Sequence, residues 1–420
     1  MRKYLLIALV LLSTACFADI KGKYFTGEDY TATTLEPLTA ASAIIEDAET
    51  GQILYGKNIH TPRQNASTTK MMTAILLIEN TKPEDMITAS ENASETPFTS
   101  IYLQPGEKIS SEDLLRAMMI RSANDTCVAA AEHISGNVAD FVKLMNDKAK
   151  KLGCVDTHFV TPNGLYAPGH HSSVYDLCII ARYGMTLKRF NEVINMRSAV
   201  LESRTVNKDN ILVKSKSEFL KTYPGADGVK SGYIKQAGNC YVGSATRNGL
   251  RLVSAILKSE NANTETAVLM DYIFTNYKRV HVATAGEVYD SVELPLCEEL
   301  PITVKKDVNC VAKRSGAEVS AKTELSDKIK TPVKAGTKVG SLVVRVDGRQ
   351  VAAEDLIAAE DSRYTAFWLF VIDFGKVAGT VIVLWLIAAI ISGAKRRRER
   401  KVRYGRGFRA DGFRSWEERT

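Results

Sequence analysis

The sequence predicts an α+β domain, an antiparallel sheet flanked by helices, followed by a small all-β domain and a C-terminal transmembrane helix. Strand-like alternation occurs at both ends of the first 280 or so residues, with helical periodicity between them. Short alternating segments separated by Gly, Pro and Asp turns follow, and an uncharged run of membrane-spanning length comes after them. A chain of 420 residues is long enough for one large domain and a smaller one.

The N-terminus has the pattern of a secretory signal. Two basic residues precede an apolar run over 4–12, and small residues continue to Ala18. We expect residues 1–18 to be a signal peptide that is cleaved after Ala18, with a buried N-terminal helix as the alternative. Cys16 follows Ser-Thr-Ala, which is a poor lipoprotein cleavage site.

The strands that open and close the first domain are expected to share one sheet. Two runs alternate like a hairpin around the turn Glu-Thr-Gly, and three more are linked by short turns: 42–47, 52–57, 229–234, 239–246 and 251–257. Helical patterns cover 68–80, 111–120, 125–134, 138–152 and 264–277. Strands at both ends of a domain must meet if the helices between them are to cover their apolar faces. We place this domain, the candidate catalytic one, at 36–280.

The pattern changes after His281. Short alternating segments such as 303–306, 317–323 and 341–346 are separated by turn residues. They indicate a small β-rich domain over 282–358.

The cysteines and histidines give no sign of a metal site. The seven cysteines form no CxxC pair and the six histidines no HExxH motif, so we expect no metal and no other cofactor. Export would permit a disulfide between Cys297 and Cys310 in the β-rich domain. Cys127 lies on a helical pattern, where we expect a buried free thiol.

Eighteen uncharged residues lie between Lys376 and Lys395. As a helix they would span about 27 Å, close to the thickness of a bilayer's hydrocarbon core. We therefore expect a transmembrane helix over 377–394, with a buried core helix as the alternative. The aromatic-rich stretch 367–372 before it is expected to lie in the headgroup region.

The C-terminal tail carries the chain's charge. Residues 395–420 hold 11 Lys and Arg against 4 Asp and Glu, which equals the formal +7 of the whole chain. A basic cluster directly after a span marks the cytoplasmic side. We expect a single-pass protein of the cell membrane with its catalytic domain outside the cytoplasm. Nucleic-acid binding by the tail is the alternative, but the topological role explains its position, so no nucleic-acid partner is expected.

Three short strings carry the chemistry, in this order: Ser-Thr-Thr-Lys at 67–70, Ser-Ala-Asn at 122–124 and Lys-Ser-Gly at 230–232. A serine hydroxyl is a weak nucleophile and needs a base, and Lys70 lies one helical turn after Ser67. The apolar run 71–78 indicates a buried helix, where desolvation would lower the pKa of the lysine amine.

None of these spacings is specific by itself. Ser392 and Lys395 repeat the Ser-x-x-Lys spacing at the end of the membrane span, and Ser-x-Asn recurs three more times. Context separates them, because residues 122–124 join two helical patterns and Lys230 opens a strand after a turn-rich segment. Without that context each string would be a helix cap or a solvated turn.

The strand that begins at Lys230 is suited to hold an extended peptide. Lys230 and Ser231 would bind a carboxylate, and Gly232 would allow close backbone approach. The N–H groups of Ser67 and Tyr233 would form an oxyanion hole. The alternative is an edge strand with a solvated lysine.

On these residues the chain resembles the low-molecular-mass penicillin-binding proteins, the serine D-alanyl-D-alanine carboxypeptidases of peptidase family S11. The resemblance covers about 36–280 and extends to Asp-Ala-Glu-Thr-Gly at 47–51, Thr-His-Phe at 157–159, Asn-Gly-Leu at 163–165 and Asp-Gly-Val at 227–229. It implies a β-lactamase/DD-peptidase-like fold.

The resemblance also implies an activity. The family removes the terminal D-alanine from peptidoglycan stem pentapeptides through an acyl-enzyme, here on Ser67, in cell-wall maturation and the control of cell shape. β-Lactam antibiotics would acylate the same serine as inhibitors. By the same resemblance Lys70 is the general base, Ser122 relays a proton to the leaving group, Asn124 positions the substrate amide, and Lys230 with Ser231 holds the terminal carboxylate.

The sequence departs from the family's pattern in two places. Ser231 stands where threonine is usual, and no arginine occurs before the last helix of the domain, in 258–265, where the family commonly has one for the carboxylate. Two other functions stay open. A β-lactamase is disfavoured because the chain has no Glu-x-x-Leu-Asn string, and a wall-binding scaffold would have kept the pocket without turnover.

Overall fold

The computed structural model describes residues 38–208, 211–326 and 329–407, so the expected signal peptide and residues 408–420 of the tail lie outside the described residues. The described chain forms two compact units. One holds the residues up to Val282 with Asp307–Lys322 and Val343–Ala353, and the other holds Ala283–Lys306, Thr323–Leu342 and the residues from Glu354 onward.

A five-stranded antiparallel sheet organises the first unit, in the order β2-β1-β9-β8-β7. Its strands are β1 (Ser42–Asp47), β2 (Ile53–Lys57), β7 (Ala226–Ile234), β8 (Gly238–Arg247) and β9 (Leu250–Ser259). Strand β1 pairs with β9, with Ser42 opposite Leu257. The two ends of the domain therefore meet in one sheet, as expected, and β7 is left at an edge.

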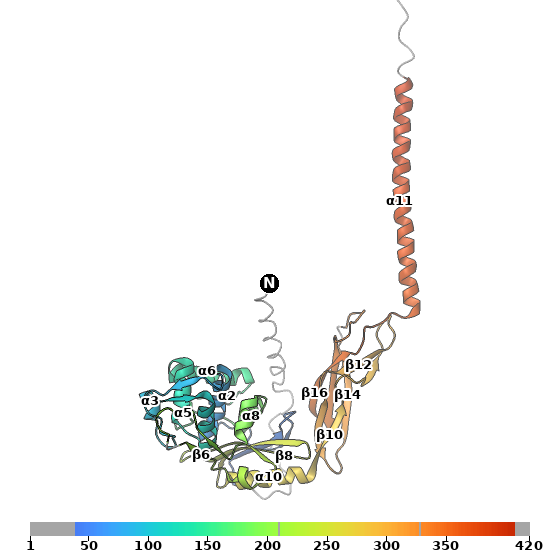
Figure 1. Cartoon of the computed structure of the whole chain (residues 1–420). Coiled ribbons are helices and arrows are strands. Elements are labelled where there is room, and N and C mark those ends of the chain that lie inside the picture. The colour runs from blue at the N-terminus through green and yellow to red at the C-terminus, as the bar shows by residue number, and fades with distance from the viewer. Residues whose placement is uncertain (1–37, 209–210, 327–328, 408–420) are drawn as a thin grey trace, which may run out of the picture. The chain divides into compact units, whose positions relative to one another are not determined.

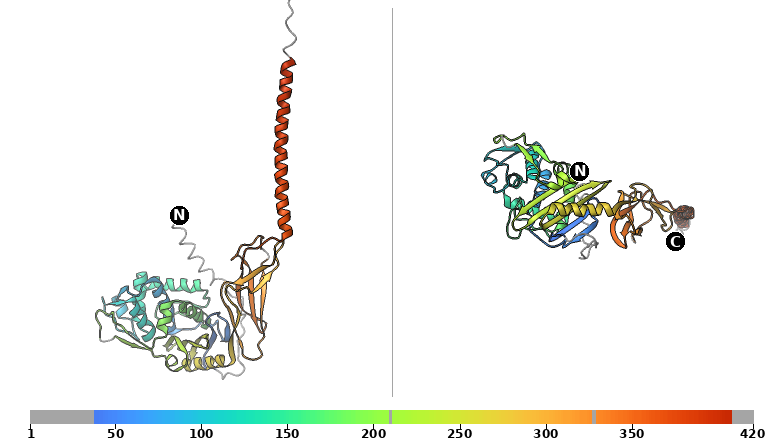
Figure 2. Two further views of the ribbon diagram at one scale, coloured as in Figure 1. Left: turned by 45° about the vertical axis from the view of Figure 1, so that its right-hand side comes forward. Right: turned by 90° about the horizontal axis from the view of Figure 1, so that it is seen from below.

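Helices cover both faces of this sheet (Figures 1 and 2). One face packs on α10 (Ala262–Asn276) and α9 (Glu218–Thr222), with Leu252 and Ile256 of β9 in that core. Val253 of β9 faces the larger helical cluster on the opposite side. This alternation buries both faces of the central strands.

The helical cluster lies between β2 and β7 in the chain. It contains η1 (Ala66–Thr69), α2 (Lys70–Asn80), α3 (Glu91–Ser94), α4 (Ser111–Arg116), η2 (Ala117–Arg121), α5 (Asp125–Ser135), α6 (Val138–Leu152), α7 (Val174–Met185) and α8 (Lys188–Ile194). Two small hairpins accompany it: β3 (Met86–Thr88) with β4 (Lys108–Ser110), and β5 (Ser198–Val200) with β6 (Leu212–Lys214). Helix α7 was not predicted from the sequence, although the Ser173 side chain caps it by accepting from the N–H of Asp176.

Helix α2 occupies the centre of this cluster. Every residue from Lys70 to Leu77 is buried, so the helix presents no solvated face over its first two turns. This confirms the expectation of a buried helix, and it means that the Lys70 side chain is removed from bulk solvent.

The C-terminal region is rich in strands. A second five-stranded sheet has the order β11-β12-β16-β15-β14, and β10 pairs with β13. The bounds are β10 (Tyr277–Ala283), β11 (Asp290–Val292), β12 (Leu300–Val304), β13 (Val308–Lys313), β14 (Val319–Leu325), β15 (Lys338–Val346) and β16 (Arg349–Ala358). The disulfide considered between Cys297 and Cys310 is not formed: both are free thiols, and they belong to different compact units. Cys127 is a buried free thiol, as expected.

Helix α11 (Ala366–Gly407) is the last described element (Figure 1). Within it, Ala366–Arg400 is long and apolar enough to cross a membrane, by length and composition. It contains both the expected span and the aromatic stretch 367–372, which continues into the span without a break.

Candidate active site

Ser67 and Lys70 lie together where η1 passes into α2. The Lys70 Nζ donates a hydrogen bond of 2.9 Å to the Ser67 Oγ. It also donates to the Asn124 Oδ1 and to the main-chain oxygen of Asn163, each at 2.7 Å. Three acceptors thus fix the amine, and one of them is the hydroxyl that it would deprotonate.

Burial sets the charge of the two site lysines. Desolvation lowers the pKa of Lys70 to about 8, with Cys127 and Asp125 acting in the opposite direction. Desolvation also lowers the pKa of Lys230 to about 7, and repulsion from Lys70 adds to this effect. Because the amines interact, they release their protons as a coupled pair. A neutral amine beside Ser67 is therefore accessible near neutral pH.

The second string, residues 122–124, contacts the Lys70 amine through Asn124. Residues 117–121 form a single π-helical turn, and Ser122 ends it in the left-handed conformation, with φ 66° and ψ 35°. Such turns occur frequently at functional sites. The Asn124 side chain that follows is buried, and its Nδ2 donates to the main-chain oxygen of Pro97 at 2.8 Å. Asn124 therefore bridges Lys70 and a neighbouring loop.

The third string lies on edge strand β7, close to the nucleophile. A Cβ built on Gly232 would lie 2.8 Å from the Ser67 nitrogen and 3.2 Å from the Thr68 nitrogen. Only glycine lets the strand approach these N–H groups so closely. The Lys230 Nζ donates to the main-chain oxygen of Ser231 at 3.0 Å, and Tyr233 is exposed at the end of the strand.

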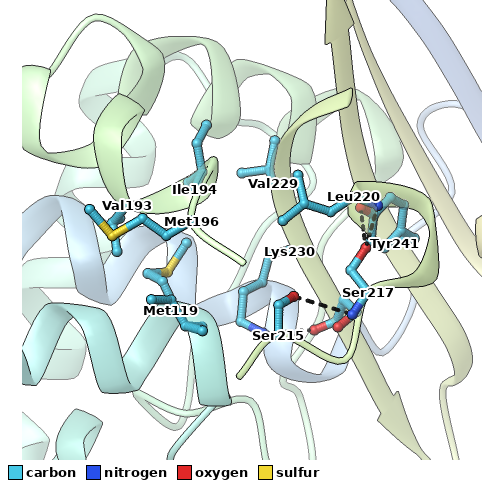
Figure 3. Close-up of a pocket in the computed structure, with 12 residues that line it drawn as sticks. Met119, Val193, Ile194, Met196, Ser215, Ser217, Leu220, Val229, Lys230 and Tyr241 are labelled. Atoms are coloured by element: carbon cyan, nitrogen blue, oxygen red, sulfur yellow. Dashed lines mark hydrogen bonds between the residues drawn. The ribbon is translucent and has the colours of Figure 1, made fainter. Parts of the chain in front are cut away.

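A small cavity of about 20 Å³ lies beside Lys230 (Figure 3). The Lys230 side chain extends between Met119 and Ser215, so the lining is apolar on one side and carries hydroxyls on the other. A polar cavity of this size has room for about one water molecule.

The loop that follows α6 entered the sequence analysis only through the family resemblance, with Asn-Gly-Leu at 163–165. No role was assigned to Asn163, although the oxygen of that residue accepts from Lys70, and the Thr73 Oγ1 donates to the Pro162 oxygen at 2.5 Å. Gly164 comes next at φ 81°, and a Cβ there would lie 2.0 Å from the Ala66 oxygen. The turn dipeptide Asn-Gly was the available signal.

His170 was also missed. Its Nδ1 accepts from the Val160 N–H at 3.0 Å, which leaves the proton on Nε2, 2.8 Å from the Thr69 Oγ1. Burial lowers the pKa of His170 to about 4, so the ring is neutral at neutral pH. The side chain ties the loop to the turn that carries Ser67.

The segment 258–265 supplies no arginine, and the carboxylate of its Glu265 is engaged elsewhere. The Glu265 carboxylate accepts from the hydroxyls of Ser259 and Thr39, each at 2.7 Å. Lys258 is exposed at the end of β9 with φ 55°. Across the described residues, no cluster of three or more His, Cys, Asp or Glu could hold a metal ion.

Two family models match this chain. The family model "D-alanyl-D-alanine carboxypeptidase" matches residues 29–261, more than half of the chain, and the model "Penicillin-binding protein 5, C-terminal domain" matches 277–363. The D-alanyl-D-alanine carboxypeptidase DacF of Bacillus subtilis is 30% identical over 378 residues, which cover 87% of this chain and 95% of the relative.

Two further relatives come from Haemophilus influenzae. Its D-alanyl-D-alanine carboxypeptidase DacA is 32% identical over 350 residues, covering 77% of this chain and 85% of the relative. The crystal structure of its penicillin-binding protein 5 superposes with a TM-score of 0.70 at 28% identity, and covers 79% of this chain and 100% of that one.

Proposed function

Because this chain belongs to the D-alanyl-D-alanine carboxypeptidase family, we propose that Ser67 is its nucleophile and that Lys70 is the base that activates it. The enzyme is a serine D-Ala-D-Ala carboxypeptidase with a role in peptidoglycan. One observation carries the residue assignment: a buried amine whose pKa is lowered to about 8 lies 2.9 Å from a serine hydroxyl.

In the proposed acylation, the Ser67 Oγ bonds to the carbonyl carbon of the penultimate D-alanine while Lys70 takes the hydroxyl proton. The carbon–nitrogen bond to the terminal D-alanine then breaks, and the leaving nitrogen receives a proton by way of Ser122. Water next adds to the ester, a proton returns to Oγ, and the shortened peptide leaves as a carboxylate. The N–H groups of Ser67 and Tyr233 stabilise the oxyanion in both steps.

The other site residues bind the substrate. Asn124 keeps capacity for a substrate amide, since a side-chain amide has two N–H groups and two lone pairs and only one of each is engaged by Lys70 and Pro97. Lys230 and Ser231 hold the terminal carboxylate at the edge of β7. A bound carboxylate would favour the charged form of Lys230.

D-Alanine release tests this proposal against the scaffold alternative. The full chain is expected to bind fluorescent penicillin covalently and to release D-alanine from a synthetic stem pentapeptide. Labelling without release would reject the carboxypeptidase assignment for this chain and favour a wall-binding scaffold or a transpeptidase. If the chain showed no labelling and no release, the assignment of Ser67 as a working nucleophile would be rejected.

The pH profile tests the two lysines separately. Activity requires a neutral Lys70, whose pKa is about 8, so deprotonation of this amine raises kcat/KM as the pH increases. Activity also requires a charged Lys230, whose pKa in the free enzyme is about 7, so deprotonation of that amine lowers kcat/KM as the pH increases. The coupled pair thus predicts a bell-shaped profile with its maximum between about 7 and 8.

Lys230→Arg, measured on the same peptide, fixes the positive charge. The alkaline limb is expected to disappear, and the acid limb is expected to stay where it is in the wild type, because Lys230 is already charged over that part of the profile. An alkaline limb that persists unchanged in this variant would show that Lys230 is not the group that must stay charged.

The finer placement of the chain's ends is also a proposal. We propose cleavage of 1–18, a catalytic domain over 36–280, a β-rich domain over 282–358, a span over 377–394 and a cytoplasmic tail over 395–420. The apolar helix α11 and the basic cluster after the span support this topology. In it, the active site faces the peptidoglycan.

A further inference from the structure

A loop beside Asn124 presents two aromatic side chains to solvent. Phe98 is 79% exposed and Tyr102 58% exposed, in the segment between α3 and β4. Both have a left-handed backbone, with φ 70° and 58°. That conformation is strained for residues other than glycine, and an exposed ring returns little burial energy. Neither feature helps the fold.

The same loop is held rigidly from below. The buried Asp125 carboxylate accepts from the Ser100 Oγ at 2.6 Å and from the N–H groups of Ile101 and Leu103 at 3.1 Å. The side chains of Ile101 and Leu103 are buried beneath it. The loop backbone over 100–103 is therefore fixed, and Tyr102 is exposed between the buried Ile101 and Leu103, so its ring is preorganised.

This loop is continuous with the active site. The Asn124 amide accepts from Lys70 at one end and donates to the Pro97 oxygen at the other, and the Asn124 N–H donates to the Thr99 oxygen at 2.7 Å. Phe98 lies between these two anchored residues. The Asn124 side chain therefore lies between the Lys70 amine, which its Oδ1 contacts, and the segment that carries Phe98, which its Nδ2 contacts.

We infer that Phe98 and Tyr102 form a binding subsite for the part of the stem peptide that precedes the two D-alanine residues. The inference rests on the proposed function, in which the terminal carboxylate lies at Lys230 on β7 and the scissile bond at Ser67. The upstream peptide must leave the cleft away from Lys230, past Asn124, where the loop presents its rings. Aromatic faces bind methylene-rich side chains and peptide planes at low entropic cost.

Asparagine replaces each ring in the test, because it tolerates the left-handed conformation and keeps the loop backbone. Phe98→Asn and Tyr102→Asn are expected to lower kcat/KM for a stem pentapeptide with lysine at its third position about tenfold, mainly through KM. Hydrolysis of acetyl-D-Ala-D-Ala, which lacks the upstream residues, is expected to stay within about twofold of wild type. Phe98→Tyr and Tyr102→Phe should retain wild-type rates on both substrates.

Val155→Asn is the matched control, since Val155 is 69% exposed and no catalytic role is assigned to it. Equal losses on the two substrates would overturn the inference, because they would indicate a loop that only supports Asn124. Unchanged rates on the pentapeptide would overturn it too. In both cases continued hydrolysis of the short substrate would leave the proposed function intact, whereas a wild-type enzyme inactive on both would reject that function instead.

Discussion

Ser67→Ala is expected to abolish covalent modification by penicillin and to lower D-alanine release by at least about 10⁴-fold. The variant removes the only oxygen that Lys70 can deprotonate in its three-acceptor arrangement, while Asn124 and the Asn163 oxygen still hold the amine. The fold should persist, because the Ser67 side chain is only half-buried and a smaller residue fits. Intact-protein mass spectrometry after incubation with penicillin measures the adduct directly.

Ser392→Ala is the matched control for this variant. Ser392 and Lys395 repeat the Ser-x-x-Lys spacing on a helix, within α11. Labelling of this variant should equal that of the wild type, and peptide mapping should locate the adduct on Ser67. A penicillin adduct of full stoichiometry on the Ser67→Ala protein would falsify the nucleophile assignment.

Gly164→Ala is expected to lower the rate constant of penicillin acylation by about 100-fold or more, since displacements near 1 Å at a reacting centre have effects of this size. A Cβ at this position would lie 2.0 Å from the Ala66 oxygen and 2.9 Å from the Thr69 Oγ1, so the turn carrying Ser67 or the loop carrying Asn163 must move. Either movement separates the Lys70 amine from one of its partners. Stopped-flow labelling with a fluorescent penicillin measures the loss.

Gly169→Ala separates steric displacement from backbone strain. Gly169 lies on the same loop at φ 83°, but the nearest atom to its Cβ would be the His158 Cδ2 at 4.0 Å. This variant should lose about 1 kcal/mol of stability from the left-handed backbone and keep its acylation rate within about threefold. If both variants lost acylation equally, the contact between Gly164 and Ala66 would not be what positions the nucleophile.

Local patterns in the sequence predicted most of the catalytic domain. The helices over 125–135 and 138–152 and the strands β7 to β9 were found within a few residues of their observed bounds, because apolar periodicity and turn residues define them locally. That strands from both ends of the domain share one sheet followed from the need to cover their apolar faces, whereas the pairing of β1 with β9 came from the structure. Helix α7 was missed, although apolar residues recur at helical spacing along it, at positions 174, 177, 178, 181 and 185.

The candidate site was predicted in part. Ser67, Lys70, Asn124 and Gly232 were named from three strings, and the described structure brings them together. The dipeptide Asn-Gly marked a turn at 163–164, but the acceptor role of Asn163 was not found, because its main-chain oxygen is the acceptor and residue identity does not encode that role. The disulfide between Cys297 and Cys310 was considered from export alone, and the structure keeps both thiols free.

By itself the sequence determined the order of the three strings, the one-turn spacing of serine and lysine, and an apolar run of membrane-spanning length followed by a basic cluster. Each depends on neighbours in the chain, through helical periodicity or charge position. Only the tertiary structure decided which Ser-x-x-Lys pair is poised to react. At 67–70 the lysine is desolvated and held by residues 54 and 93 positions away, whereas Lys395 is exposed on α11. Proton affinity follows burial and surrounding charge, and these are set by segments distant in the chain.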